Sequence, residues 1–254
     1  MSIGAVCLRN KKKAGRVSRR SCLFCFAVVE YIHQTKGVSP IKNYLFDFDG
    51  TLVDSMPVFC GVTLRVLDEN GISYEKDIIK TITPLGILGV SKYYHEVLGL
   101  SKPVEEIAQL ICDYMYEEYL LRIPAKKNVS RVLRKLKEGG ANLNVLSASP
   151  HLTLDPCLKR LGLYDLFTNV WSCDDFGTTK ADPEIYRRAA EKIGAPVSEI
   201  LFLDDNFNAD KTAKEAGMKV CAVYDASSEE YIEEMKTHFD RFIYDFSELL
   251  EIEL

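Results

Sequence analysis

The segment Tyr44-Leu-Phe-Asp-Phe-Asp-Gly-Thr51 is a short apolar run that ends in two acids and a glycine. This order predicts a buried strand that leads into a loop. Asp47 and Asp49 stand two positions apart, so both carboxylates lie on the same face of an extended segment. Two neighbouring acids are costly to bury unless a cation lies between them. The segment therefore indicates either a polar turn after a strand or a cation site.

Short apolar runs and helical patterns alternate in the C-terminal half of the chain. The predicted strands are 142–147, 166–171, 200–204 and 219–224, and the predicted helices are 129–138, 152–161, 183–193 and 209–216. Strands that alternate with helices form βαβ units, whose parallel sheet is covered on both faces. We therefore predict an α/β fold with a doubly wound parallel sheet, in which the ligand site lies at the carboxyl ends of the strands.

A long interval of about ninety residues separates the first predicted strand from the second. An ordinary crossover is far shorter. Helical patterns fill most of the interval, at 58–70, 75–81, 92–98 and 103–121. We expect a small helical domain at 55–123, inserted into an α/β core that is formed by 41–54 and 124–254. An insertion directly after the loop that follows the first strand is typical of a lid that covers the site.

The first forty residues differ from the rest. Residues 1–20 carry seven Lys/Arg and no acid, and the apolar run Cys22–Val29 follows. A signal peptide has the same order, but this run is only eight residues long and no small-residue cleavage site follows it. Cys22 and Cys25 have the spacing of a redox or metal pair, without a second pair to complete a site. We expect a poorly ordered extension and no export.

The composition of the chain excludes several classes of protein. Of 254 residues, 47% are hydrophobic and 27% are charged, as in soluble globular proteins. The formal net charge is −5, and residues 21–254 hold 25 basic against 37 acidic side chains, which argues against nucleic acid as a partner. No apolar run approaches the roughly 20 residues that span a bilayer. Cys60, Cys112, Cys157 and Cys221 lie in apolar segments, which predicts buried free thiols and a cytoplasmic location.

Polar residues also mark the ends of the later strands. Ser147 ends the second predicted strand, and Asp204 and Asp205 end the fourth, with Asp210 about one turn further on. Lys180 lies between them, ahead of a predicted helix. Alone, Ser147 is explained as a strand-end cap and Lys180 as a solvated loop residue. Taken with the first acid pair, these residues form an ordered set along the chain. A hydroxyl, an ammonium and an acid cluster follow the first two acids, each near the end of a predicted strand.

This ordered set resembles the four motifs of the haloacid dehalogenase (HAD) superfamily, over about residues 42–225. The segment Asp47–Ser55 resembles the phosphoglycolate phosphatase and β-phosphoglucomutase branch, and the insertion resembles the helical C1 cap of that branch. The resemblance implies a Rossmann-like core with an inserted all-helical cap. It also implies a Mg²⁺-dependent phosphatase that acts on a small phosphorylated metabolite, as a monomer or weak homodimer.

The resemblance assigns a role to each motif residue. Asp47 attacks the phosphoryl group and forms an aspartyl-phosphate. Asp49 protonates the leaving oxygen and then deprotonates the attacking water. Ser147 and Lys180 bind the phosphoryl oxygens and offset the charge of the transition state. Thr51 is expected to contact the substrate as well.

The resemblance also supplies a set of metal ligands. Mg²⁺ is a hard cation that prefers oxygen ligands. The implied ligands are the side chains of Asp47 and Asp205 and the main-chain oxygen of Asp49. Asp204 stands where many relatives have glycine and others an acid, and we expect it to support the ligands. Asp210 comes one residue later than in the commonest spacing, and we expect it to support the metal site, directly or through water.

Two departures from the family pattern bear on the function. The third motif usually reads Lys-Pro, whereas here Lys180 precedes Ala181-Asp182-Pro183, so the loop geometry is expected to differ slightly. In β-phosphoglucomutase a His follows the first motif, and the matching residue here is Phe59, which favours hydrolysis. The 2-haloacid dehalogenases lack the second acid of the first motif. This chain has Asp49 at that position, which argues against a dehalogenase. A phosphotransferase and a non-catalytic phosphate-binding protein are the alternatives.

The segment Thr83–Lys92 has two glycines and a proline between helical patterns, which predicts a loop in the cap. Gly89-Val-Ser-Lys92 resembles the specificity loop of β-phosphoglucomutase, where a basic residue holds a second anionic group of the substrate. Lys92 is then expected to select substrates with a remote carboxylate or phosphate. His95 lies three residues on and assists it. The alternative is that Lys92 starts a helix on a solvated face.

Overall fold

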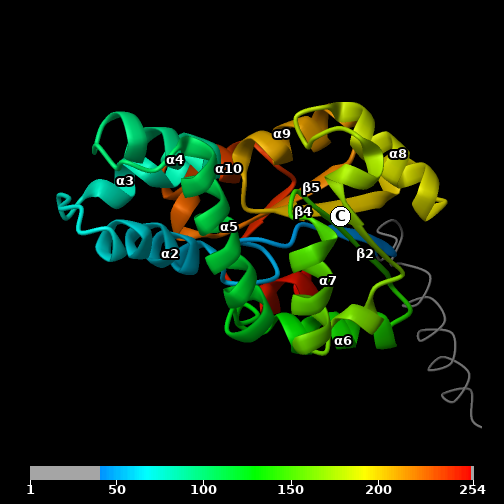
Figure 1. Cartoon of the computed structure of the whole chain (residues 1–254). Helices are drawn as coiled ribbons and strands as arrows, with labels where there is room; N and C mark the ends of the chain where they lie inside the picture. Colours follow the sequence, from blue (N-terminus) through cyan, green and yellow to red (C-terminus); the bar gives the residue numbers. More distant parts are fainter. Residues whose placement is uncertain (1–40, 253–254) are drawn as a thin grey trace, which may run out of the picture. The chain divides into compact units, whose positions relative to one another are not determined.

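A parallel six-stranded sheet runs through residues 41–252, the part of the chain that the computed structural model describes (Figure 1). The strands are β1 (Asn43–Phe46), β2 (Asn142–Ser147), β3 (Asn169–Ser172), β4 (Ile200–Asp204), β5 (Lys219–Val223) and β6 (Arg241–Ile243). Their spatial order is β3-β2-β1-β4-β5-β6. The chain therefore reverses its direction of winding between β3 and β4, and the carboxyl ends of β1 and β4 flank the switch point where such sheets bind ligands. The predicted doubly wound α/β fold is confirmed.

Some sequence predictions lie outside the described residues. These are the poorly ordered extension at 1–40, its resemblance to a signal peptide, and the pair Cys22 and Cys25. Within 41–252, the helices are too short or too polar to cross a membrane.

Helices cover both faces of the sheet (Figure 1). They are α6 (Val129–Glu138), α7 (His151–Arg160), α8 (Pro183–Ile193), α9 (Phe207–Ala216) and α10 (Ile232–His238). Tyr44 and Phe46 of β1 pack with side chains of α6 and α7, whereas Leu45 packs with those of α8 and α9. Successive strand side chains point to opposite faces, so a continuous apolar strand fills both layers of the core.

Short 3₁₀ helices complete the connections. They are η2 (Thr83–Leu85), η3 (Tyr164–Leu166), η4 (Cys173–Phe176), η5 (Val197–Glu199), η6 (Ala226–Tyr231) and η7 (Phe246–Glu251). The C-terminal elements α10 and β6 follow the last strand that the sequence pattern predicts. β6 is only three residues long, so it offers too few positions for a period-2 pattern to be recognised.

Four helices lie between β1 and α6 and form the inserted helical cap. They are α2 (Met56–Glu69), α3 (Ile78–Ile82), α4 (Gly86–Glu96) and α5 (Val104–Leu121). Val66, Val90 and Ile111 are fully buried among them. The same cluster of buried side chains continues from the cap to α6 and α7. The division of the chain into separate domains at 55 and 123 therefore stays a prediction.

The loop predicted at Thr83–Lys92 is wrong, because η2 and α4 occupy this segment. Glycine disfavours a helix by about 1 kcal/mol, and that local signal suggested a loop. Gly86 has a φ of 62° and makes the turn between η2 and α4, and only Gly89 lies inside a regular helical turn. Val90 and Tyr94 are fully buried, and burial of these two side chains outweighs the low helix propensity of one glycine.

The expected burial of the thiols is confirmed only in part. Cys157 and Cys221 are buried, Cys60 is half-buried, and Cys112 is exposed, which corrects the prediction for this residue. The buried side chains of α5 recur at helical spacing, and Cys112 directly follows one of them, Ile111. A neighbour in sequence is rotated by about 100° around a helix axis, so Cys112 lies off the buried stripe.

Candidate active site

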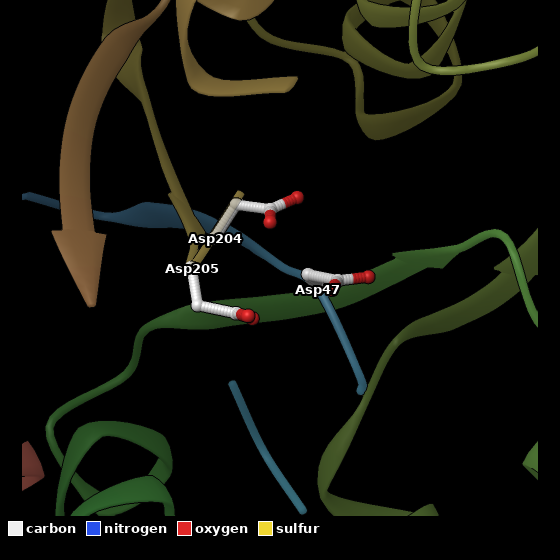
Figure 2. A group of neighbouring side chains, drawn as sticks. All are labelled: Asp47, Asp204 and Asp205. Atoms are coloured by element: carbon white, nitrogen blue, oxygen red, sulfur yellow. The ribbon is translucent and has the colours of Figure 1, made fainter. Parts of the chain in front are cut away.

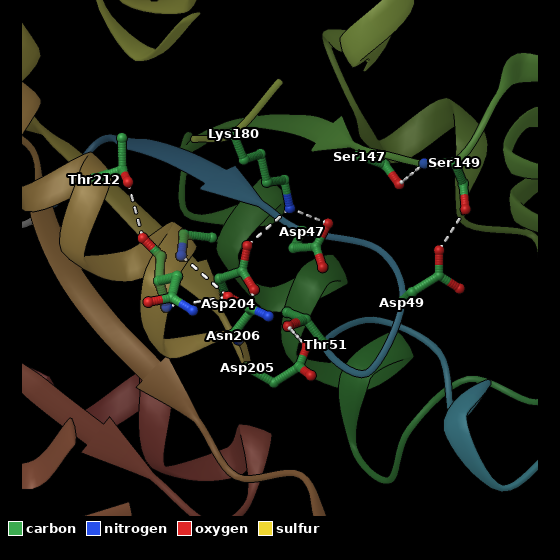
Figure 3. A network of polar contacts seen from close by, with 12 residues as sticks. Asp47, Asp49, Thr51, Ser147, Ser149, Lys180, Asp204, Asp205, Asn206 and Thr212 are labelled. Atoms are coloured by element: carbon green, nitrogen blue, oxygen red, sulfur yellow. Dashed lines mark hydrogen bonds and ion pairs between the residues drawn. The ribbon is translucent and has the colours of Figure 1, made fainter. Parts of the chain in front are cut away.

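The predicted catalytic residues meet at the carboxyl edge of the sheet (Figure 3). Asp47 directly follows β1, Ser147 ends β2 and Asp204 ends β4. The backbone N–H of Asp47 donates to the carbonyl of Leu203 at 2.8 Å, so the pairing of β1 with β4 extends to the first acid. The register of two neighbouring strands therefore sets where the Asp47 carboxylate lies.

Asp47, Asp204 and Asp205 form a buried acid cluster (Figure 2). Each contributes one carboxylate oxygen, and these oxygens all lie within 4.8 Å of one another. Their exposed fractions are 7%, 1% and 6%. A group of convergent carboxylate oxygens suits a hard divalent cation such as Mg²⁺, so the donor set fits the metal that the sequence predicted. Asp204 is a member of this cluster, and its expected role in support of the metal ligands stays a prediction.

The cluster is under electrostatic repulsion. Burial, followed by the charges of Asp204 and Asp49, raises the pKa of Asp47 to about 8. Burial and then the charges of Asp204 and Asp47 raise the pKa of Asp205 well above its ordinary range. A cation bound among the carboxylates offsets both effects, because it favours the charged forms.

Lys180 supplies a positive charge beside the cluster. Its Nζ forms ion pairs with Asp47 and with Oδ2 of Asp204, the latter at 2.8 Å. Burial lowers the pKa of Lys180, but the charges of Asp204 and Asp47 outweigh burial and leave the pKa well above its ordinary value. Asp182 caps α8 by accepting from the N–H of Glu184 at 2.9 Å. The departure from Lys-Pro therefore adds a helix cap, and Lys180 still reaches Asp47.

Two residues of the loop after β1 fix Asp205. Thr51 is fully buried, and its hydroxyl donates to Oδ1 of Asp205 at 2.8 Å. Gly50 has a φ of 74°, and a Cβ at this position would lie 2.3 Å from Oδ2 of Asp205. Only glycine permits both this backbone conformation and this close approach. The expected contact of Thr51 with the substrate stays a prediction.

Asp210 is a buried acid without a hydrogen-bond partner among residues 41–252. It lies in the first turn of α9 and is fully buried. Burial and then the charges of Asp204 and Asp205 raise its pKa well above the ordinary range. A buried carboxyl group without a partner in this range, close to Asp204 and Asp205, is suited to a site that holds a cation or ordered water. The expected support of the metal site by Asp210 stays a prediction.

Asp49 points toward a second set of partners. The hydroxyl of Ser149 donates to its Oδ2 and the hydroxyl of Tyr119 to its Oδ1, both at 2.5 Å. Oγ of Ser147 accepts from the backbone N–H of Ser149 at 2.9 Å. Tyr119 is not among the residues predicted from the sequence, because a tyrosine inside a helical pattern carries no local sign of a partner 70 positions away.

The sequence model of the haloacid dehalogenase-like hydrolases matches residues 41–217. The chain belongs to this family. The resemblance found in the motifs and the expected class of enzyme, a HAD-like hydrolase, are thereby confirmed.

Curated relatives of this HAD-like hydrolase include a phosphoglycolate phosphatase and a pyrophosphatase. The chain is 29% identical over 191 residues to a phosphoglycolate phosphatase of Thiobacillus denitrificans, covering 72% of this chain and 83% of that protein. It is 27% identical over 186 residues to the pyrophosphatase PpaX of Bacillus velezensis, with the same coverage. The crystal structure of a HAD family hydrolase of Deinococcus radiodurans with bound phosphate and sodium shares the fold, with a TM-score of 0.69. The two sequences are 21% identical, and the match covers 83% of this chain and 93% of that chain.

Lys126 is another residue of this HAD-like hydrolase that the sequence analysis missed. Its Nζ donates to the carbonyl of Gly50, to the carbonyl of Tyr224 at 2.8 Å and to Oδ2 of Asp225 at 2.8 Å. An ammonium has three donors, so these three acceptors use all of them. Lys126 thereby ties the loop after β1 to the end of β5.

Lys92 lies exposed on α4. None of the hydrogen bonds and ion pairs found in residues 41–252 joins it to the acid cluster. Nδ1 of His95 lies 2.9 Å from the carbonyl of Lys102 and 3.1 Å from that of Leu100, so His95 supports the connection from α4 to α5. Selection of the substrate by Lys92 stays a prediction.

The metal-free protein should lose stability as the pH rises from about 4 to about 8. The pKa of Asp47 is raised from 3.8 to about 8, so the folded state holds a proton that the unfolded state releases. This contribution is present below the unfolded pKa and is lost as the pH rises through the folded value. Calorimetric Tm values in EDTA measure it, and added Mg²⁺ should restore Tm at the higher pH. An equally steep decline in Asp47→Asn would contradict the assignment.

Proposed function

We propose that this HAD-like hydrolase is a Mg²⁺-dependent phosphatase that hydrolyses a small phosphorylated metabolite. The observation that carries the proposal is the contact between Asp47 and Lys180 within a buried acid cluster. A nucleophile, a fixed positive charge and a set of metal ligands are the groups that phosphoryl transfer needs. The relatives named as a phosphoglycolate phosphatase and a pyrophosphatase support a phosphorylated substrate.

In the first step, a carboxylate oxygen of Asp47 attacks phosphorus. The bond from phosphorus to the leaving oxygen breaks, and an aspartyl-phosphate forms. Asp49 gives its proton to the leaving oxygen. Lys180 already contacts Asp47, so its ammonium lies beside the phosphoryl oxygens on which charge builds. Ser147 is the expected second contact to those oxygens.

In the second step, Asp49 takes a proton from water, and the water oxygen attacks the phosphorus. The bond between phosphorus and Asp47 breaks, and inorganic phosphate leaves. Bound Mg²⁺ supplies positive charge that offsets the charge of the phosphoryl group. The side chains of Asp47 and Asp205 and the main-chain oxygen of Asp49 are the proposed ligands, with Asp204 and Asp210 in support.

The proposal includes a cytoplasmic location and a monomer or weak homodimer. Cys157, Cys173 and Cys221 are free and buried, which is typical of proteins in a reducing compartment. Phe59 packs half-buried against the core, where β-phosphoglucomutase has a His, and this supports water over a sugar as the acceptor.

Replacing either acid of the first motif should remove activity without unfolding the protein. Asp47→Asn leaves no nucleophile, because the amide oxygen is far less nucleophilic than a carboxylate. Asp49→Asn should lower kcat by about 10²–10⁴-fold through the loss of acid–base catalysis. Hydrolysis of p-nitrophenyl phosphate and phosphoglycolate measures turnover, and circular dichroism checks the fold. An Asp47→Asn variant that keeps more than a few per cent of the activity would exclude Asp47 as the nucleophile.

Turnover should disappear in EDTA and return with Mg²⁺. Ca²⁺ should inhibit, because its longer and more flexible coordination disturbs the in-line geometry. Titration of activity with Mg²⁺ should give a weaker affinity in Asp205→Asn than in the wild type. A matched control is Asp155→Asn, since Asp155 pairs with His151 on α7 and belongs to no metal ligand set. Full activity in the chelator would refute the metal requirement.

Lys92→Ala should raise KM for phosphoglycolate several-fold and leave p-nitrophenyl phosphate nearly unchanged. Phosphoglycolate carries a remote carboxylate that an ammonium can hold, whereas p-nitrophenyl phosphate has no second anion. Lys80→Ala is the control, since Lys80 is an exposed lysine on the neighbouring helix α3. Equal losses on both substrates would show that Lys92 supports the cap generally.

A further inference from the structure

Both carboxylate oxygens of Asp49 accept a hydrogen bond from a hydroxyl group. Ser149, in the loop after β2, donates to Oδ2 (Figure 3), and Tyr119, in the last turn of cap helix α5, donates to Oδ1. Among the hydrogen bonds found in residues 41–252, the bond from Tyr119 is the one that joins a cap side chain to an acid of the first motif. The orientation of the proposed acid–base therefore depends on the cap.

Tyr119 is itself held in place from several sides. Its side chain is 7% exposed, and its ring stacks on Phe48, with ring centroids 5.8 Å apart and an interplanar angle of 27°. Arg160 of α7 donates from Nε to the carbonyl of Tyr119 at 3.2 Å. A phenol keeps its proton at neutral pH, so the hydroxyl of Tyr119 remains a donor to Oδ1 of Asp49.

Ser149, the other hydrogen-bond partner of Asp49, can change between donor and acceptor. A serine hydroxyl rotates easily and can either donate or accept. If Tyr119 still donates to Oδ1 when Asp49 carries a proton, that proton must reside on Oδ2. Ser149 can then turn away from Oδ2, which leaves the proton free to reach a leaving oxygen.

We propose that Tyr119 is a positioning residue that fixes Oδ1 of Asp49 as an acceptor and directs the transferable proton to Oδ2. This inference rests on the proposed function, in which Asp49 protonates the leaving group. The proton moves from Oδ2 to the leaving oxygen as the bond from phosphorus to that oxygen breaks. Oδ2 later takes a proton from the attacking water, while Oδ1 stays bonded to Tyr119 throughout.

The inference predicts a dependence on the leaving group. Glycolate and glycerol leave as unstable alkoxides unless they are protonated, whereas p-nitrophenolate is stable without a proton. The ratio kcat/KM reports the steps up to the first irreversible one, which includes departure of the leaving group and excludes hydrolysis of the aspartyl-phosphate. Tyr119→Phe should therefore lower kcat/KM at least tenfold for phosphoglycolate and glycerol 2-phosphate, and less than about threefold for p-nitrophenyl phosphate.

Two controls separate positioning from a structural role. Tyr114→Phe removes a hydroxyl from the same helix, one that donates to Glu69 inside the cap, and should change neither value of kcat/KM. In an Asp49→Asn background, Tyr119→Phe should add no further loss, since the two residues act through one carboxylate. Tyr119→Phe keeps the ring on Phe48, and its Tm should stay within a few degrees of the wild type.

Equal losses on alkyl and aryl phosphates, or losses that add to those of Asp49→Asn, would overturn the role of Tyr119 while leaving the phosphatase activity established. No loss on any substrate would overturn it as well. A wild-type protein that hydrolyses none of the three phosphates would overturn the proposed function, and this inference with it.

Discussion

Three buried carboxylates lie together at the carboxyl edge of the sheet beside one ammonium that pairs with two of them, and the rest of the site is arranged around that imbalance. Asp47, Asp204 and Asp205 are each less than a tenth exposed, and within residues 41–252 the ion pairs to this cluster come from Lys180, which contacts Asp47 and Asp204. Like charges so close together are unfavourable in a buried site unless a further cation joins them. The fold therefore holds an arrangement that a bound cation would stabilise.

Three separate parts of the structure maintain this arrangement. The pairing of β1 with β4 holds Asp47 beside Asp204, and Gly50 and Thr51 fix Asp205 from the loop after β1. Lys126 anchors the same loop to the end of β5. The cap adds a contact of its own through Tyr119. The sheet thus positions Asp47, the proposed nucleophile, while the cap contacts Asp49, the proposed acid–base, through Tyr119.

Two predictions from the sequence, the loop at Thr83–Lys92 and the burial of Cys112, are wrong for the same physical reason. Two glycines suggested a loop at Thr83–Lys92, but buried Val90 and Tyr94 stabilise α4 there. An apolar neighbourhood suggested a buried Cys112, but its place on the helix turns it outward. In both cases a local property of one residue was outweighed by packing of the whole helix, to which propensity contributes only weakly.

The alternation of strands and helices and the polar residues at the strand ends could be predicted from the sequence. Hydrophobic periodicity and the chemistry of strand-end acids are local, so Asn142–Ser147, Val129–Glu138 and Pro183–Ile193 were predicted with their observed bounds. Only in the folded protein do Tyr119 and Lys126 reach the loop after β1. Those two contacts span 70 and 76 positions of the chain. No local pattern encodes such a pair, because only the packing of the cap and the winding of the sheet bring the partners together.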